Sequence, residues 1–558
     1  MKFLYAKSKT TKSAAAAIVL TVLVVILIAG SALPSHAQIP APTILYGFQQ
    51  LPTDVIEPNG TIAQGTDGNL YGTGGNRGAN NTGGVFKITP AGAESVLVNF
   101  PVGDEAACSN GLTLAMDGNF YGACYYQGAN NVGYIYRVTP AGVLTDIYDF
   151  PGKGGVGYPL SAPILGADGN LYGTTGGSSS PYVVYRVSTA GVYKTLYSFI
   201  DGNSVPSVLS AGSDGNLYGT EADADGFGNV GGVFRVSTGG AFKLLYGFVS
   251  TTNVFYPSTG VIRDTNGKLY GTTAFPSGTA GSGTLYDVTV GGVVTDIVNF
   301  PSSLNFDEAA NNMTQASNGN LYGASYNGGT NAGGGLYELT TANVFSSWSF
   351  TASNAGTGAT GSGPTAPLFQ NTNGLLYGIT VAGGPNAAQG TFFSLNVGAA
   401  PFISLLTPVY SGKEGTEVGI LGQGFSSSSV VKFGGTTATT KTLTGSTFIQ
   451  ATVPAGALTG KVTVTTGSTT LSTIATYDVT PTFKTFTPAS GPVGTVVTIT
   501  GTGLEQATKV TFNKVVATFT VVSDTEITAM VPAGATTGKI VVFTKGGSAT
   551  NATNFTVN

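Results

Sequence analysis

The sequence is poor in the residues on which most catalytic and metal chemistry depends. Among 558 residues it has one histidine, two cysteines and one tryptophan, and only 9% are Asp, Glu, Lys or Arg. The histidine, His36, lies in an N-terminal segment that we expect to be removed. Mechanisms that need an imidazole base or a histidine metal ligand are therefore excluded for the remaining chain, and we expect no bound cofactor.

Positive charge is also scarce. The sequence has 23 Lys and Arg against 27 Asp and Glu. Four of the basic residues and none of the acidic ones lie within the first 37 residues, which leaves 19 against 27, a formal charge of −8. A protein that neutralises nucleic-acid phosphates needs a basic excess. We therefore expect no nucleic-acid partner.

The N-terminal segment has the features of a secretory signal. Four lysines precede an apolar run from Ala14 to Ala29, and Ser35-His36-Ala37 is a small-x-small cleavage site. We predict a signal peptide over residues 1–37 and a secreted or extracytoplasmic protein. The apolar run is shorter than the roughly 20 residues of a spanning helix, so no membrane span is expected in the mature chain. An uncleaved anchor is the alternative.

The two cysteines, Cys108 and Cys124, are predicted to lie at the open end of one hairpin. In an exported protein such a pair favours a disulfide. A redox-active or metal-binding pair is the alternative, but the spacing is not CxxC and no third ligand is nearby in the sequence.

A tandem repeat organises the first 400 residues. Its core is Asp67-Gly68-Asn69-Leu70-Tyr71-Gly72-Thr73, and the Tyr-Gly pair returns every 46 to 55 residues. The repeat-defining tyrosines are Tyr71, Tyr121, Tyr172, Tyr218, Tyr270, Tyr322 and Tyr377. An Asp-Gly or Asn-Gly turn precedes each one, which is the strongest short-range hairpin signal. We expect these tyrosines to pack between repeats.

Each repeat predicts four short antiparallel strands, the content of one β-propeller blade. The last strand ends in Phe in six repeats, as in the segment 96–100, but the seventh repeat lacks this strand. A matching segment, Ile44-Leu45-Tyr46-Gly47-Phe48, precedes the first repeat. We therefore predict an all-β fold in which a seven-bladed propeller over residues 38–398 is closed by the N-terminal strand. An open solenoid is the rival.

The chain after Val397 is an approximate duplication, with one copy over residues 401–480 and the other over 481–558. The segment Val453-Pro454-Ala455-Gly456, for example, matches Val531-Pro532-Ala533-Gly534. Alternating apolar strands with frequent turns predict two immunoglobulin-like β-sandwiches. No apolar tail precedes Asn558, so we expect a released or non-covalently held protein, and a monomer.

These motifs carry two family resemblances. The Asp/Asn-Gly-Asn-Leu-Tyr-Gly-Thr core, with its Gly-rich loop and Val-Phe strand, resembles the GloVer-type tandem repeat of secreted bacterial "choice-of-anchor" proteins. The duplicated C-terminal landmarks resemble IPT/TIG domains, closely in the second copy and more loosely in the first. The first resemblance implies an exported or surface protein, and the second implies an Ig-like spacer or recognition module without catalytic residues.

The loops between the second and third predicted strands vary most between repeats, and they are expected on one rim of the propeller. This rim is a candidate binding surface, although Gly and Asn there also serve turn geometry. One loop, counted from Glu221, carries Asp223 and Asp225 at the alternate positions of a calcium loop, with Gly226 sixth and Asn229 ninth. The twelfth position is Gly232 and not Glu, so a solvated acidic loop is the alternative to a structural calcium site.

We expect a non-enzymatic, exported or cell-surface binding protein whose propeller face recognises a glycan, polymer or surface protein. One alternative is an exported polysaccharide hydrolase or lyase that uses carboxylates such as Asp104 and Glu105 or Asp307 and Glu308, because glycoside hydrolysis needs only two carboxylates. A structural envelope or matrix component is a further alternative. A glycan-binding protein should expose tyrosines, or Trp348, flanked by amides, although Trp348 stands at a position typical of the core.

Overall fold

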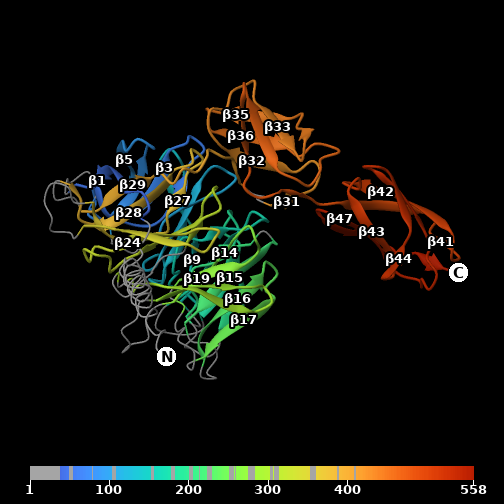
Figure 1. Ribbon diagram of the computed structural model, residues 1–558, viewed down its shortest axis with the longest axis horizontal. Coiled ribbons are helices and arrows are strands. Elements are labelled where there is room, and N and C mark those ends of the chain that lie inside the picture. Colours follow the sequence, from blue (N-terminus) through green and yellow to red (C-terminus); the bar gives the residue numbers. More distant parts are fainter. Residues whose placement is uncertain are drawn as a thin grey trace, which may run out of the picture.

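The structure is a computed structural model, and Figure 1 shows its arrangement. It describes residues 38–558 apart from 50–53, 78, 103–107, 153–155, 177–181, 200–204, 213, 223–228, 250–256, 258, 274–282, 302–303, 305, 307–312, 352–359, 386–388 and 407–409. The described chain is all-β and contains no α-helix. Within that part of the chain, no helix has the length and apolarity to span a membrane.

Seven antiparallel sheets, here called the repeat sheets, follow one another along the first 400 residues. Each holds four strands in chain order, except that the seventh also takes up the first strand of the chain. The strands of sheets one to seven are, in order: β2 (Val55–Gln64), β3 (Leu70–Arg77), β4 (Gly84–Ile88) and β5 (Glu94–Asn99); β6 (Thr113–Leu114), β7 (Phe120–Cys124), β8 (Tyr134–Val138) and β9 (Leu144–Asp149); β10 (Ile164–Leu165), β11 (Leu171–Thr174), β12 (Tyr182–Val187) and β13 (Tyr193–Phe199); β14 (Ser210–Ala211), β15 (Asn216–Glu221), β16 (Asn229–Ser237) and β17 (Phe242–Val249); β18 (Ile262–Arg263), β19 (Leu269–Thr272), β20 (Thr284–Val288) and β21 (Val294–Asn299); β22 (Thr314–Gln315), β23 (Leu321–Ser325), β24 (Gly335–Leu339) and β25 (Phe345–Ser349); β26 (Ser362–Pro364), β27 (Phe369–Gln370), β28 (Leu376–Ala382) and β29 (Thr391–Leu395), with β1 (Thr43–Gly47).

The strand near the N-terminus joins the last repeat sheet. β1 pairs antiparallel with β29, and Tyr46 lies opposite Phe392. This is the pairing that the sequence predicts from the missing strand of the seventh repeat. It satisfies the backbone groups along the outer edge of β29, which would otherwise be exposed.

Apolar clusters join each repeat sheet to the next. Seven such clusters occur, and one of them places Tyr377 and Phe392 of sheet seven against Leu70 and Phe86 of sheet one. Each repeat-defining tyrosine belongs to a different cluster. All seven of these tyrosines are buried. Packing between the sheets is therefore supplied by the same sequence position in every repeat.

The tyrosine and the glycine of the Tyr-Gly motif are required for different physical reasons. The tyrosine hydroxyl reaches back to the turn four residues earlier: Tyr121 donates to Asp117 at 2.7 Å, and Tyr377 accepts from Asn373 at 2.9 Å. The glycine leaves room for an aromatic ring of the third strand. A Cβ at Gly122 would lie 2.3 Å from the Tyr136 hydroxyl oxygen. The same conflict with a ring recurs at the other six Tyr-Gly glycines.

Two sandwich modules with the same strand order follow the repeat sheets. The first module contains β30 (Ser404–Leu405), β31 (Ser411–Gly412), β32 (Glu417–Leu421), β33 (Val430–Phe433), β34 (Thr436–Thr437), β35 (Lys441–Thr444), β36 (Phe448–Thr452), β37 (Val462–Thr466), β38 (Thr469–Ser472) and β39 (Asp478–Val479). The second contains β40 (Thr482–Thr487), β41 (Ser490–Gly491), β42 (Val496–Thr502), β43 (Ala507–Phe512), β44 (Val515–Ala517), β45 (Phe519–Ser523), β46 (Glu526–Met530), β47 (Ile540–Thr544), β48 (Gly547–Thr550) and β49 (Thr556–Val557). In Figure 1 the first module (orange) lies against the repeat sheets and the second (red) lies beyond it.

Candidate functional site

The repeat sheets have two different faces. In each sheet the Asp-Gly or Asn-Gly turn joins the first strand to the second, and a loop joins the second strand to the third. Turns and loops therefore lie at opposite ends of the second strand. We call the surface formed by the strand ends with the turns the turn face, and the surface formed by the strand ends with the loops the loop face. The turn face contains the turns of the repeat motif, and the loop face contains the variable loops.

The first module covers part of the turn face. The Thr447 hydroxyl donates to the Thr66 carbonyl at 2.7 Å, and the Gln423 side-chain amide donates to the Thr372 hydroxyl at 2.8 Å. Three apolar residues of the module, Leu406, Leu421 and Phe448, belong to the apolar cluster between sheets one and two. These contacts leave the loop face as the surface on which a ligand can be sought.

The loop of sheet two has a well-defined conformation. The Gly133 amide donates to the Gln127 carbonyl at 3.0 Å, and the Ala129 amide donates to Asp149 Oδ1 at 2.6 Å. Gln127 and Asn131 have φ values of 69° and 55°. Asn tolerates such left-handed conformations, whereas Gln adopts them less often. The loop of sheet six has equivalents of both hydrogen bonds, and the loop of sheet one has an equivalent of the second.

Three tyrosines gather on the loop face beside this loop, and we call them the tyrosine cluster: Tyr125, Tyr126 and Tyr158. The ring centroids lie 4.7 Å apart for Tyr125 and Tyr126, 5.4 Å for Tyr125 and Tyr158, and 5.6 Å for Tyr126 and Tyr158. Tyr126 is 53% exposed, and the other two are half-buried. An exposed aromatic ring packed against two half-buried ones is typical of an interaction site, where tyrosine is enriched.

Tyr158 comes from the connection into sheet three and is held there by backbone contacts. Its amide donates to the Val132 carbonyl at 2.6 Å, and its carbonyl accepts from the Gly176 amide at 2.7 Å. Its φ of 59° is uncommon for an aromatic residue. Residues in such conformations are often found at functional sites. The cluster therefore bridges two neighbouring sheets.

The described side chains beside the cluster are mostly polar and uncharged, and the Asp149 carboxylate, which accepts the Ala129 amide, is a charged neighbour. Asn130 and Asn131 are exposed on the same loop, and Gln127 is half-buried. Burial, followed by the neighbouring hydroxyls of Tyr126, Tyr158 and Tyr182, raises the pKa of Tyr125 above its ordinary value. Its hydroxyl therefore stays protonated at neutral pH and can donate a hydrogen bond.

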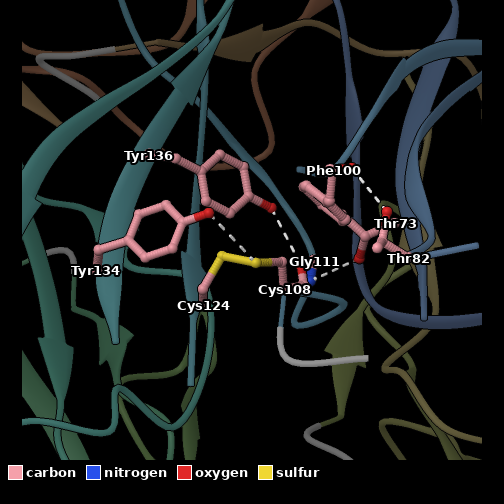
Figure 2. Close-up of a disulfide and its surroundings, with 8 residues drawn as sticks. All are labelled: Thr73, Thr82, Phe100, Cys108, Gly111, Cys124, Tyr134 and Tyr136. Atoms are coloured by element: carbon pink, nitrogen blue, oxygen red, sulfur yellow. Dashed lines mark hydrogen bonds between the residues drawn. A yellow bond between two sulfur atoms is a disulfide. The ribbon is translucent and has the colours of Figure 1, made fainter. Parts of the chain in front are cut away.

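A disulfide lies directly before the cluster in the chain. Cys108 and Cys124 are bonded and fully buried, as the sequence predicts. Figure 2 shows Tyr134 and Tyr136 beside the bond: the Tyr136 hydroxyl donates to the Cys108 carbonyl at 3.2 Å, and the Tyr134 hydroxyl lies 3.6 Å from Cys108 Sγ. Because Tyr125 directly follows Cys124, the disulfide restrains the backbone next to the first tyrosine of the cluster.

Several residues proposed from the sequence cannot be placed. Asp104, Glu105, Asp307, Glu308, Asp223 and Asp225 lie outside the described residues, as does the signal segment 1–37. Asn229 begins β16, but its side chain is not described. Among the residues that are described, no group of three or more His, Cys, Asp or Glu side chains could hold a metal ion. The calcium loop and the carboxylate pairs therefore stay predictions.

Trp348 is placed and the tyrosine cluster was not foreseen. Trp348 is partly buried in β25, with its ring 4.9 Å from that of Phe350. The loops were expected to form a binding surface, but Tyr125, Tyr126 and Tyr158 were not among the residues expected to form a site. The Tyr125-Tyr126 doublet was the available signal, because the aligned positions of the first repeat are Gly75 and Asn76.

The fold and this site define an all-β repeat protein with an exposed aromatic surface and C-terminal sandwich modules. The Gloeobacter/Verrucomicrobia repeat model matches residues 57–275 and 206–448, which together cover more than half of the chain. The chain belongs to this repeat family. An IPT/TIG domain model matches residues 481–557, the second module. No curated protein matches the chain.

Solved structures match at low similarity. A fungal alcohol oxidase of the AA5 family, in complex with copper, has 12% identity and a TM-score of 0.39 and covers 92% of this chain and 100% of its own. A gluconolactonase from Xanthomonas campestris has 16% identity and a TM-score of 0.33 over 55% of this chain and 98% of its own. A surface glycan-binding protein from Prevotella bryantii has 20% identity and a TM-score of 0.22, over 28% of this chain and 41% of its own. TM-scores this low establish neither a shared fold nor a shared function.

Proposed function

We propose that the protein is an exported, non-enzymatic binding protein that recognises carbohydrate through the tyrosine cluster. The observation that carries this proposal is the grouping of Tyr125, Tyr126 and Tyr158 on the loop face, with centroid separations of 4.7 to 5.6 Å. A signal peptide over residues 1–37 would direct export of the chain to an oxidising compartment and then be removed. The disulfide between Cys108 and Cys124 suits that compartment.

The chemistry of the cluster suits a sugar better than a charged ligand. A tyrosine ring offers an apolar face and a hydroxyl, and a pyranose ring offers an apolar C–H face and hydroxyls in the same way. The adjacent Asn131 is exposed, as is Asn130, whose side-chain amide already donates to the Phe150 carbonyl at 2.8 Å. None of the three tyrosines carries a charge at neutral pH, and the nearby Asp149 carboxylate already accepts the Ala129 amide.

The architecture we propose is a closed seven-bladed propeller with two Ig-like spacers. Support comes from the pairing of β1 with β29 and from the apolar cluster between sheets seven and one. In this arrangement the first module sits on the turn face and the loop face points away from it. The two modules would then hold the binding face at a distance from whatever surface the C-terminus meets.

The test is binding of purified residues 38–558 to a broad glycan and polysaccharide array, with product release assayed in the same wells. We expect saturable binding without products. Tyr126→Ala should weaken the binding at least about tenfold, which corresponds to a loss of about 1.4 kcal/mol. Tyr326→Ala is the matched control, because Tyr326 occupies the position equivalent to Tyr125 in the sheet-six loop and is 37% exposed.

Each outcome separates the proposal from its rivals. Equal losses in Tyr126→Ala and Tyr326→Ala would refute a role for the tyrosine cluster. Product release would instead favour the hydrolase or lyase that uses Asp104 and Glu105 or Asp307 and Glu308. Absence of binding to every glycan would overturn carbohydrate recognition and favour a protein partner or a structural role.

A further inference from the structure

A cavity of about 550 Å³ lies along the first strands of the repeat sheets, apart from the tyrosine cluster. β2 forms one wall, residues in and beside β6, β10 and β27 form others, and Leu406 and Leu421 of the first module also line it. We call it the axial cavity. Its volume is within the range of small-molecule sites, which is about 300–1,000 Å³.

Apolar side chains predominate in the part of the axial cavity at the turn face, where the hydrogen-bonded side chains of Gln64 and Gln370 also line it. Leu114, Ile164 and Phe369 of the repeat sheets line it there, and Leu406 and Leu421 close it from the first module. Leu406 and Leu421 are only 8% and 5% exposed. None of the described lining residues is charged. A charged ligand would lose its hydration without gaining a partner, and this is costly.

Most polar side chains of the wall are already hydrogen-bonded to the protein. Gln64 exchanges two bonds with Thr372, at 2.9 and 3.0 Å. The Thr61 hydroxyl donates to the Leu112 carbonyl at 3.3 Å, and the Ser161 hydroxyl donates to the Ala162 carbonyl at 3.1 Å. A cavity whose polar groups are satisfied in this way holds water poorly and accepts apolar groups.

Amide side chains line the other end of the axial cavity. Asn59 lies on β2 opposite Thr73, towards the loop face, whereas Gln64 lies opposite Leu70 next to the turn. Asn110 also lines the cavity, and both asparagines are half-buried. The side-chain amides of Asn59 and Asn110 therefore line the end towards the loop face, whereas Leu406 and Leu421 line the end at the first module, beside the hydrogen-bonded side chain of Gln64.

We infer that the axial cavity binds an uncharged amphiphile of small size, with its apolar chain against Leu406 and Leu421 and its hydroxylated head near Asn59 and Asn110. The cavity volume, the lack of charge on its described wall, and the placement of two asparagines at one end and two leucines at the other favour this class of ligand. Because the first module supplies the floor, a bound ligand also adds apolar contact between that module and the repeat sheets.

The test is a titration of residues 38–558 with Nile red, an uncharged apolar dye, followed by displacement. We expect saturable fluorescence enhancement, with 1-octanoylglycerol displacing the dye at least about tenfold better than octanoate at pH 8, a difference of about 1.4 kcal/mol. Failure of the folded chain to bind the dye saturably would overturn the inference. Equal displacement by both compounds would overturn the inference that the head group of the ligand is uncharged.

Variants at one register position locate the binding. Ile164 pairs with Tyr172 in sheet three, and Ala63 holds the equivalent position opposite Tyr71 in sheet one. Ile164→Trp and Ala63→Leu should fill the axial cavity and weaken dye binding at least about tenfold. Ile262→Trp is the control, because Ile262 pairs with Tyr270 in the same way but is not among the lining residues.

Circular dichroism and thermal melting establish that each variant is folded before its binding is compared. If Ile164→Trp does not fold, Ala63→Leu gives the same comparison with a smaller change. Undiminished dye binding in a folded filling variant would refute the axial cavity as the site. Tyr126→Ala should bind the dye as the unmodified chain does; a loss there would place the dye at the tyrosine cluster and also overturn the inference.

Discussion

The hydroxyl of Tyr46 donates to a carboxylate oxygen of Asp54 at 3.0 Å, which links the strand that completes the last repeat sheet to the segment that enters the first. The same carboxylate oxygen accepts the Gln49 amide at 2.6 Å. Glu94 at the start of β5 is close enough for its charge to raise the pKa of Tyr46, and for the charge of Asp54 to raise the pKa of Glu94. Two carboxyl groups and a phenol therefore share the seam between sheets seven and one.

Stability should depend on pH through this seam. Burial, and then the charge of Asp54, raise the pKa of Glu94 from 4.5 to about 7. A carboxyl whose pKa is raised on folding stabilises the folded state below its unfolded pKa, and that stability is lost as pH rises through the folded value. The free energy of unfolding should therefore fall between about pH 4.5 and 7.

Glu94→Gln tests this dependence because glutamine resembles the protonated side chain. The variant should lack this part of the pH-dependent decline. At pH 8 its free energy of unfolding should exceed that of the unmodified protein by about 1 kcal/mol, after allowance for solvent screening at a half-buried group. Urea unfolding at pH 5 and pH 8 measures the difference. Other carboxyl groups, such as Glu414, are present in both proteins and cancel. Parallel pH profiles for the two proteins would contradict the prediction.

The glycine of the Tyr-Gly motif should be intolerant of a methyl group. In Gly122→Ala the new Cβ would lie 2.3 Å from Tyr136 atoms in a buried cluster, and overpacking of this kind costs about 1–3 kcal/mol. Gly239→Ala is the matched control, since its nearest neighbour is the Ser237 hydroxyl oxygen at 3.6 Å. Urea unfolding of both variants decides the matter. Equal stability in the two would show that the core can relax around the methyl group.

The disulfide should contribute to stability through the unfolded chain. It closes a loop between residues separated by 16 positions, and a loop of this length corresponds to about 3 kcal/mol. We expect the free energy of unfolding of the Cys108→Ala, Cys124→Ala double variant to be lower by that amount, so that it unfolds at a lower urea concentration. Dithiothreitol should destabilise the unmodified protein similarly and leave the double variant unchanged. Destabilisation of the double variant by the reductant would point to an effect other than the disulfide.

Local sequence signals were sufficient for the secondary structure of the repeats. The Asp-Gly and Asn-Gly turns specify hairpins because they accept positive φ, and Gly68, Gly118 and Gly169 have φ values of 82°, 76° and 80°. The pairing of β1 with β29 could also be predicted, because a repeat that lacks one strand needs a matching strand from elsewhere. The duplicated landmarks likewise identified the second module, which an IPT/TIG model matches.

The sequence by itself thus determined the repeat, the disulfide partners and the order of the modules, since each follows from residues that are close in the chain or copied at a fixed period. The tertiary structure alone decided that Tyr158 meets Tyr125 and Tyr126, because they belong to different sheets and meet only when those sheets pack together. It also decided that Leu406 and Leu421 line the axial cavity. Contacts of this kind depend on the angles between packed sheets, and no local pattern in the sequence records those angles.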